Sequence, residues 1–242
     1  MLTIRLPKSR NWAEFAVIAK TVEMVLEKKP MKQWNIEVTL STVSTICSNG
    51  PTMTEDARAS EKAYPWLCGL VEVIIKRHRH RLEGHFHLLI IALQSLLRLL
   101  IIPWPTATLS SLPANTSTSP PPDQQSQAAR FARLLTLTCE PSVASVTRGQ
   151  APGGALDSAP DAAKKSAAQH MYLVLVLYIK LQLERPVPRG VRAALDPGVY
   201  SVLDITTHEG RRVINEAVDG SGRTIFREMY KQYVRFGKWN GI

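Results

Sequence analysis

The side chains best suited to chemistry lie in the run Lys76–Arg81, which mixes four cations with two histidines, and in His85 and His87 just beyond it. Four histidines within ten residues suggest a metal site. On a helix, however, residues two apart point about 200° away from each other, whereas helical zinc ligands are spaced four residues apart. The segment contains no Cys or Asp, and its cations would repel a metal ion. A solvated helix end or a phosphate contact explains the run better, and a metal-bound hydrolase is the weakest alternative.

A second basic pattern lies near the C-terminus, where cations recur every fourth residue at Arg223, Arg227, Lys231 and Arg235. This spacing places them in one ridge along a helix. Glu228 is the only carboxylate in the segment and is not spaced to neutralise the ridge, which is therefore either a solvated face or an anion-binding face. Lys238 and Trp239 follow, and Trp239 is suited to stacking on a base, docking on a partner or packing against the domain.

No enzyme signature accompanies these patterns. The Gly-rich stretch Asp219–Gly222 lacks the preceding strand and the Lys-Ser/Thr of a phosphate-binding loop, and no nucleophile elbow or zinc-protease motif occurs. We predict a non-enzymatic protein without catalytic residues, cofactor, resident metal or small-molecule substrate. The candidate residues for binding RNA or a protein partner are Lys76, Arg77, Arg79, Arg81, Arg211, Arg212, Arg223, Arg227, Lys231, Arg235, Lys238 and Trp239.

The composition is that of a globular, helix-rich protein with a positive charge. The chain has 242 residues, of which 45% are hydrophobic and 7% aromatic, and its net charge is +10. This surplus favours anionic partners such as nucleic acid, acidic proteins or a membrane face. The three cysteines, Cys47, Cys68 and Cys139, form no close pair, which favours a reducing compartment.

Hydrophobic spacing predicts helices along most of the chain. Asn11 to Glu14 has the form of a capping box, and Pro30 ends the helix that follows. The segment 34–47 is ambiguous because its β-branched residues also suit a strand, and we interpret it as helix. Thr206 to Glu209 is a further capping box. The later helices are predicted at 65–81, 85–102, 128–139, 161–184, 191–195, 200–205, 208–218 and 221–236, with a break at Pro197-Gly198.

Two segments lack the pattern of a packed element. Pro, Ser and Thr make up 15 of the 25 residues of 103–127, which predicts a disordered linker. A loop rich in Gly, Pro and Ala is expected at about 141–160. We expect residues 1–102 and 128–242 to form one all-α, helical-repeat (solenoid-like) bundle around these insertions.

The apolar run at residues 86–102 raises a membrane-associated protein as the alternative. It is flanked by the basic run, as the positive-inside rule requires. It is nevertheless at the short limit for a span and contains Gln94, Ser95 and Arg98. A buried core helix is the better interpretation, so we expect no membrane partner.

Several segments form a recognisable set together, namely 78–89, 93–97, 193–200, 203–205, 210–215, 221–223 and 233–241. The ending Phe236-Gly237-Lys238-Trp239 and the upstream Pro197-Gly198-Val199-Tyr200 are the most specific parts. The set resembles the C-terminal domain of the unhealthy ribosome biogenesis protein 2 family, which are fungal nucleolar pre-ribosome assembly factors. The likeness spans most of residues 12–241.

The resemblance implies a helical-repeat scaffold without catalysis of its own, acting in early nucleolar maturation of the large ribosomal subunit. It implies preribosome-associated scaffold proteins and a DEAD-box helicase as partners, with contact to precursor rRNA through the basic faces. Family members are longer, so we expect the chain to correspond to their C-terminal part.

Overall fold

The computed structural model describes residues 3–51, 58–82, 84–104, 122–142 and 158–237, and this part contains helices and no strand. The predicted all-α fold is therefore confirmed. The α-helices are α1 (Trp12–Lys28), α2 (Gln33–Asn49), α3 (Ala59–Arg77), α4 (Phe86–Ile101), α5 (Pro122–Cys139), α7 (Ser158–Ala168), α8 (Tyr172–Glu184), α9 (Arg189–Ile205), α10 (His208–Ala217) and α11 (Gly220–Gln232). Short 3₁₀ helices lie at η1 (Thr3–Lys8) and η2 (Arg79–Leu82), and a π-helical turn, η5 (Tyr233–Gly237), follows α11.

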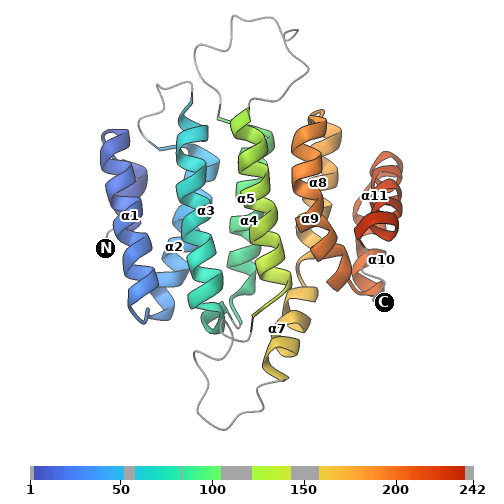
Figure 1. The fold of residues 1–242 in the computed structure, drawn as a ribbon, viewed down its shortest axis with the longest axis horizontal. Helices are drawn as coiled ribbons and strands as arrows, with labels where there is room; N and C mark the ends of the chain where they lie inside the picture. Colours follow the sequence, from blue (N-terminus) through green and yellow to red (C-terminus); the bar gives the residue numbers. More distant parts are fainter. Residues whose placement is uncertain (1–2, 52–57, 83, 105–121, 143–157, 238–242) are drawn as a thin grey trace, which may run out of the picture.

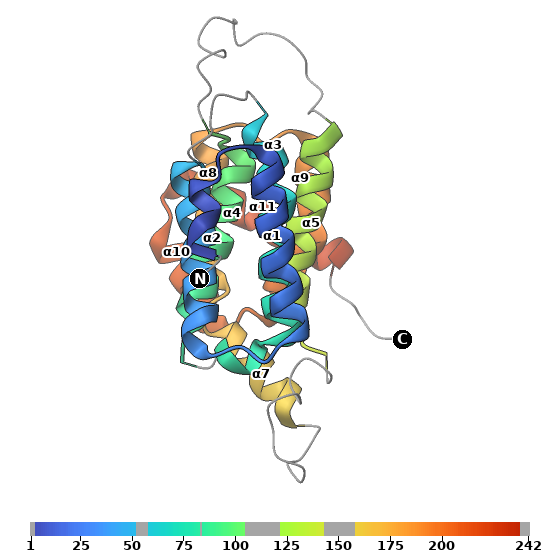
Figure 2. The ribbon, with the colours of Figure 1, turned by 90° about the vertical axis from the view of Figure 1, so that its left-hand side faces the viewer.

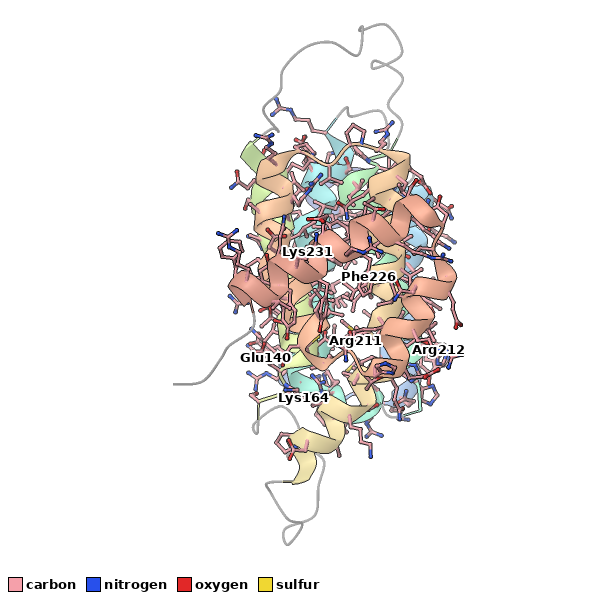
Figure 3. The ribbon with its side chains drawn as sticks, turned by 90° about the vertical axis from the view of Figure 1, so that its right-hand side faces the viewer. Glu140, Lys164, Arg211, Arg212, Phe226 and Lys231 are labelled. Carbon is pink, nitrogen blue, oxygen red and sulfur yellow. The ribbon has the colours of Figure 1, made fainter. Side chains whose placement is uncertain are left out.

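Most of the helices stand in two layers with their axes roughly along the same direction (Figures 1 and 2), whereas α11 runs across the end of the row (Figure 3). In one layer α1, α3, α5 and α9 lie side by side, and in the other α2, α4, α8 and α10 do so. The pair α10 and α11 closes the end of the row that carries the C-terminus (Figure 1). The arrangement is that of a helical bundle, and its solenoid-like character stays a prediction.

The core fills the space between the two layers. Ten of the sixteen residues of α4 are buried, because this helix packs against α2, α3, α5 and α8. The apolar run proposed as a membrane anchor is thus the central helix of the bundle. Across the described ranges, no helix combines the length and the apolarity needed to cross a membrane.

The first two helices follow the sequence prediction. The Asn11 side chain accepts a hydrogen bond from the Glu14 amide at 2.8 Å, and the Glu14 carboxylate accepts one from the Arg10 amide at 2.8 Å. The ambiguous segment is the helix α2. Its hydroxyl-bearing residues are accommodated because they bond to carbonyls one turn back, as Thr39 does to Asn35 at 2.7 Å.

The sequence analysis predicts that a helix begins at Pro65, and this is wrong. Pro65 lies inside α3, which starts six residues earlier at Ala59. Proline has no N–H, so the carbonyl of Glu61, four residues back, receives no bond from position 65. The side chain of Gln127 on α5 donates to this carbonyl at 3.2 Å. A neighbouring helix therefore supplies the donor that proline removes.

The predicted break at Pro197-Gly198 is also wrong, since α9 continues through both residues. Gly198 faces α5, and a Cβ atom at this position would lie 2.6 Å from the Cα and carbonyl oxygen of Ala132. Glycine is thus needed for the close approach of two helices. Pro-Gly usually ends a helix, but at 197–198 the glycine allows α9 to pack closely against α5.

Two further boundaries differ from the prediction. α5 begins at Pro122, so the last six residues of the predicted linker are helical, with Pro122 and Asp123 in the first turn as helix starts favour. At its other end the predicted linker is also ordered, since Trp104 is buried and donates to the carbonyl of Cys47 at 2.8 Å. Residues 105–121 of the predicted linker and 143–157 of the predicted loop lie outside the described residues. The segment 161–184, predicted as a single helix, forms two helices, α7 and α8, joined by a turn at 169–171. The two helices pack in different places: α7 contacts α5 and α9, whereas α8 contacts α4, α10 and α11.

Candidate functional site

Two short helices at the C-terminal end of the row form the largest concentration of predicted binding residues. Thr207 caps α10 by accepting a hydrogen bond from the Gly210 amide at 3.1 Å, one residue later than the predicted capping box. Asp219 caps α11 in the same way, from the Gly222 amide at 2.7 Å. Because only two residues separate the helices, the second cap fixes where α11 starts relative to α10.

A shallow groove of about 840 Å³ runs between α10 and α11. We call it the α10–α11 groove. Five predicted cations line it, two from α10 and three from α11, and Figure 3 labels Arg211, Arg212 and Lys231 among them. Phe226 is buried beneath it and Tyr230 is half-buried. The full set of lining cations is Arg211, Arg212, Arg223, Arg227 and Lys231.

The partners of these cations leave most of their charge available. Arg212 pairs with Glu216 at 3.0 Å, and Lys231 with Glu228 at 2.7 Å, both between largely exposed side chains. The bond to Glu216 raises the pKa of Arg212. Exposed pairs of this kind contribute little to stability and are readily exchanged. Among the described residues, none forms a hydrogen bond or an ion pair with the Arg227 side chain.

Two arginines of the groove are oriented by neighbours other than carboxylates. Arg211 donates to the Tyr230 hydroxyl at 2.7 Å and lies over the same ring, 5.6 Å from its centroid. Arg223 donates through Nε to the carbonyl of Asn215 at 2.9 Å, which leaves its terminal nitrogens free to bind an anion. The groove thus presents preoriented guanidinium groups rather than a random positive face.

Arg235, the last cation of the predicted ridge, does not line the groove. It lies on η5, and its guanidinium stands 4.9 Å from the ring centroid of Phe236, whose side chain is 71% exposed. η5 is held to the bundle by Tyr233, whose hydroxyl donates to Asp204 at 3.1 Å. Lys238 and Trp239, both predicted to bind, lie outside the described residues.

The run Lys76–Arg81 covers the C-terminal end of α3 and most of η2, and it is divided among different environments. Arg77 pairs with Glu27 at 3.7 Å and Lys76 with Glu72. Arg77 and Arg81 line a second depression, of about 480 Å³, together with Lys28 and Lys29 at the end of α1. Sequence reasoning missed these two lysines because no local pattern links them to residues some fifty positions later.

Arg79 is inside the fold, with 6% of its surface exposed. Its guanidinium donates to the carbonyls of Leu137 at 3.0 Å and Thr138 at 2.6 Å, at the end of α5, where a helix has no N–H left to satisfy them. Burial lowers its pKa to about 10. Arg79 therefore stabilises the junction of α3 and α5, and we exclude it from the binding surface.

The histidines proposed as weak metal ligands have separate partners. A ring nitrogen of His78 lies 2.7 Å from the carbonyl of Leu26, and His85 lies 3.2 Å from a carboxylate oxygen of Glu37. In the part of the chain that the structure describes, no three His, Cys, Asp or Glu side chains gather as a metal site would require. The three cysteines are free and buried, and burial raises the pKa of each thiol, to about 12 for Cys68.

Comparison with known protein families gives a match that covers most of the chain. The model of the Urb2/Npa2 family matches residues 16–242, which is nearly the whole chain. The comparisons found no similar curated protein and no similar solved structure. The match includes both helices of the α10–α11 groove.

Proposed function

The chain belongs to the Urb2/Npa2 family, which gives it a role in ribosome biogenesis, and on this premise we propose that it is a non-catalytic helical scaffold module. It acts in early nucleolar assembly of the large ribosomal subunit. Its protein partners in this proposal are preribosome-associated scaffold proteins and a DEAD-box helicase. Its nucleic-acid partner is precursor rRNA, bound through basic helical faces.

The observation that carries the proposal is the α10–α11 groove. Arg223, Arg227 and Lys231 recur every four residues, so they are spaced by about 6 Å along the axis of α11. A regular row of charges suits a regular polyanion such as an RNA backbone. Arg211 and Arg212 lie on the other wall of the groove, and arginine binds phosphate oxygens through two parallel hydrogen bonds.

The proposal is tested by measuring the affinity of the chain for a fluorescently labelled segment of large-subunit precursor rRNA at several salt concentrations. Each single-strand phosphate contact lowers log K by about 0.7 per unit of log salt. Replacement of Arg223, Arg227 and Lys231 by Gln should weaken binding and make the salt slope shallower by about two units.

The matched control replaces three other exposed cations by Gln, namely Lys165, Lys180 and Arg189. They line neither the α10–α11 groove nor the depression at the end of α1. It removes the same charge from the same helical bundle, so both its affinity and its salt slope should change much less. Equal slopes for the two triple variants would show that RNA responds only to net charge, and would contradict a binding site in the α10–α11 groove.

A further inference from the structure

A second cleft lies on the side of α11 that faces away from the α10–α11 groove. It has a volume of about 270 Å³ and is bounded by α8, α9 and α11. On α11, the middle of the face that lines the cleft lies roughly 160° around the helix from the middle of the face that lines the groove, and the two faces border each other at Thr224 and Lys231. The two sites share one contact, because Glu228 of the cleft pairs with Lys231 of the groove at 2.7 Å, and an occupant that binds Glu228 replaces this pair.

The cleft combines apolar walls with carboxylates. Val199, Ile225 and Met229 supply apolar surface, and Asp196 and Glu228 supply the acidic groups. No described residue forms a hydrogen bond or ion pair with the Asp196 carboxylate. Burial raises the pKa of Asp196, and Arg192 one turn away on α9 offsets only part of this effect.

Tyr178 on α8 gives an independent indication of an occupant. Its side chain is 3% exposed and borders the cleft, and its hydroxyl has no hydrogen-bond partner among the described residues. Buried hydroxyls in native proteins nearly always have a partner. The cleft is much larger than the roughly 30 Å³ that one water molecule occupies in the liquid. It is therefore large enough to admit a side chain that completes this bond.

We propose that the cleft between α8, α9 and α11 binds an arginine side chain presented by a protein partner. The guanidinium lies between Asp196 and Glu228 and donates to the Tyr178 hydroxyl, while its methylene stem packs on Met229. Arginine fits better than lysine because its planar group offers five donors and is less strongly hydrated than an ammonium. Arg192 also lines the cleft, and its guanidinium donates to the carbonyl of Val187 at 3.5 Å. An anionic occupant that bound Arg192 would be repelled by the carboxylates of Asp196 and Glu228, so the cleft favours a cation.

The test uses the 242-residue chain labelled with ¹³C at its methionine methyl groups, with the Met229 signal assigned from Met229→Leu. The probes are N-acetyl-arginine methylamide and its neutral isostere N-acetyl-citrulline methylamide. We expect a saturable shift of the Met229 methyl signal with the arginine probe, and an affinity lower by about tenfold or more for the citrulline probe. Equal affinities, or no saturable shift, would overturn the proposal.

Variants separate binding from folding. Asp196→Asn should weaken the arginine probe by about tenfold, while Glu216→Gln, which removes an equal charge from the α10–α11 groove, should not. Tyr178→Phe should weaken the probe without lowering the thermal midpoint of the free chain, because it removes a hydroxyl that has no partner there. A lowered midpoint would mean that the fold itself satisfies this hydroxyl, and would contradict an occupant.

The pH dependence provides a second readout on Asp196. Its pKa is raised in the fold, so between the ordinary value of 3.8 and the raised value the folded state binds more protons than the unfolded state. Stability is therefore lost as the pH rises through this window. Asp196→Asn should have a higher thermal midpoint than the parent chain at neutral pH, and the difference should vanish below pH 3.8. Saturation with the arginine probe should reduce the same difference.

Discussion

Arg79 and Arg81 lie two residues apart in one basic run, yet the fold gives them opposite environments. Arg81 is exposed at the edge of a depression, whereas Arg79 is buried and bonded to two carbonyls of α5. Only the position of α5, nearly sixty residues later, distinguishes them. The run could therefore be identified as basic from the sequence, but its division into structural and surface cations could not.

This division predicts different effects of one substitution at the two positions. Arg79→Met removes two charge-assisted hydrogen bonds and leaves the carbonyls of Leu137 and Thr138 buried without donors. Because burial of the charge already has a cost, we expect a net loss of about 1 to 3 kcal/mol in the free energy of unfolding. Chemical denaturation of the purified chain measures it.

Arg81→Met is the control, since it removes the same group from an exposed position and should change stability by less than about 0.5 kcal/mol. If the two variants were equally stable, the guanidinium of Arg79 would not be holding the end of α5.

The α10–α11 groove was accessible to sequence reasoning in part. The four-residue spacing of Arg223, Arg227 and Lys231 predicted a ridge on one helix, and the structure places them together. That Arg211 and Arg212 form the facing wall depends on the angle between two helices, which no local pattern encodes. The cleft at Asp196 was missed for the same reason, because its walls come from three helices.

At the scale of the element, proline and glycine produced the largest errors. Helix existence was predicted correctly wherever apolar residues recur at helical spacing, as in α1 and α4. Pro65 and Pro197 were interpreted as helix boundaries from local rules, yet both lie inside helices. In each case a contact with α5, from Gln127 or with Ala132, sets the outcome.

The bond from Gln127 predicts energetic coupling with Pro65. Gln127→Met removes the donor to the Glu61 carbonyl and should cost about 1 to 2 kcal/mol of stability. In a Pro65→Ala background the backbone N–H of residue 65 satisfies the same carbonyl, so Gln127→Met should cost about 1 kcal/mol less. Denaturation of the parent, both single variants and the double variant gives the coupling.

Pro65→Ala alone is the internal control for the change in helix propensity. An identical cost of Gln127→Met in both backgrounds would show that Gln127 contributes packing only, and that the helix tolerates the proline without its help.

At the scale of the whole molecule, two layers of helices position the candidate sites. Within each layer, every helix packs against the next one along the row, and α10 and α11 close one end (Figures 1 and 3). Three hollows open on different parts of this bundle: the α10–α11 groove, the cleft at Asp196 and the depression at the C-terminal ends of α1 and α3. The bundle thus presents a row of cations and an acidic cleft on different faces of α11, and in the function proposed above these faces bind RNA and a protein partner.

The most direct test of this account is crosslinking of the tagged chain in cells, followed by purification and sequencing of the attached RNA. We predict enrichment of large-subunit precursor rRNA, and its loss when Arg227, Lys231 and Arg235 are changed to Glu. The same reversal at Lys165, Lys180 and Arg189 should leave it in place. Unchanged recovery of precursor rRNA with the Arg227, Lys231 and Arg235 variant would show that the basic residues of α11 and η5 do not bind this RNA.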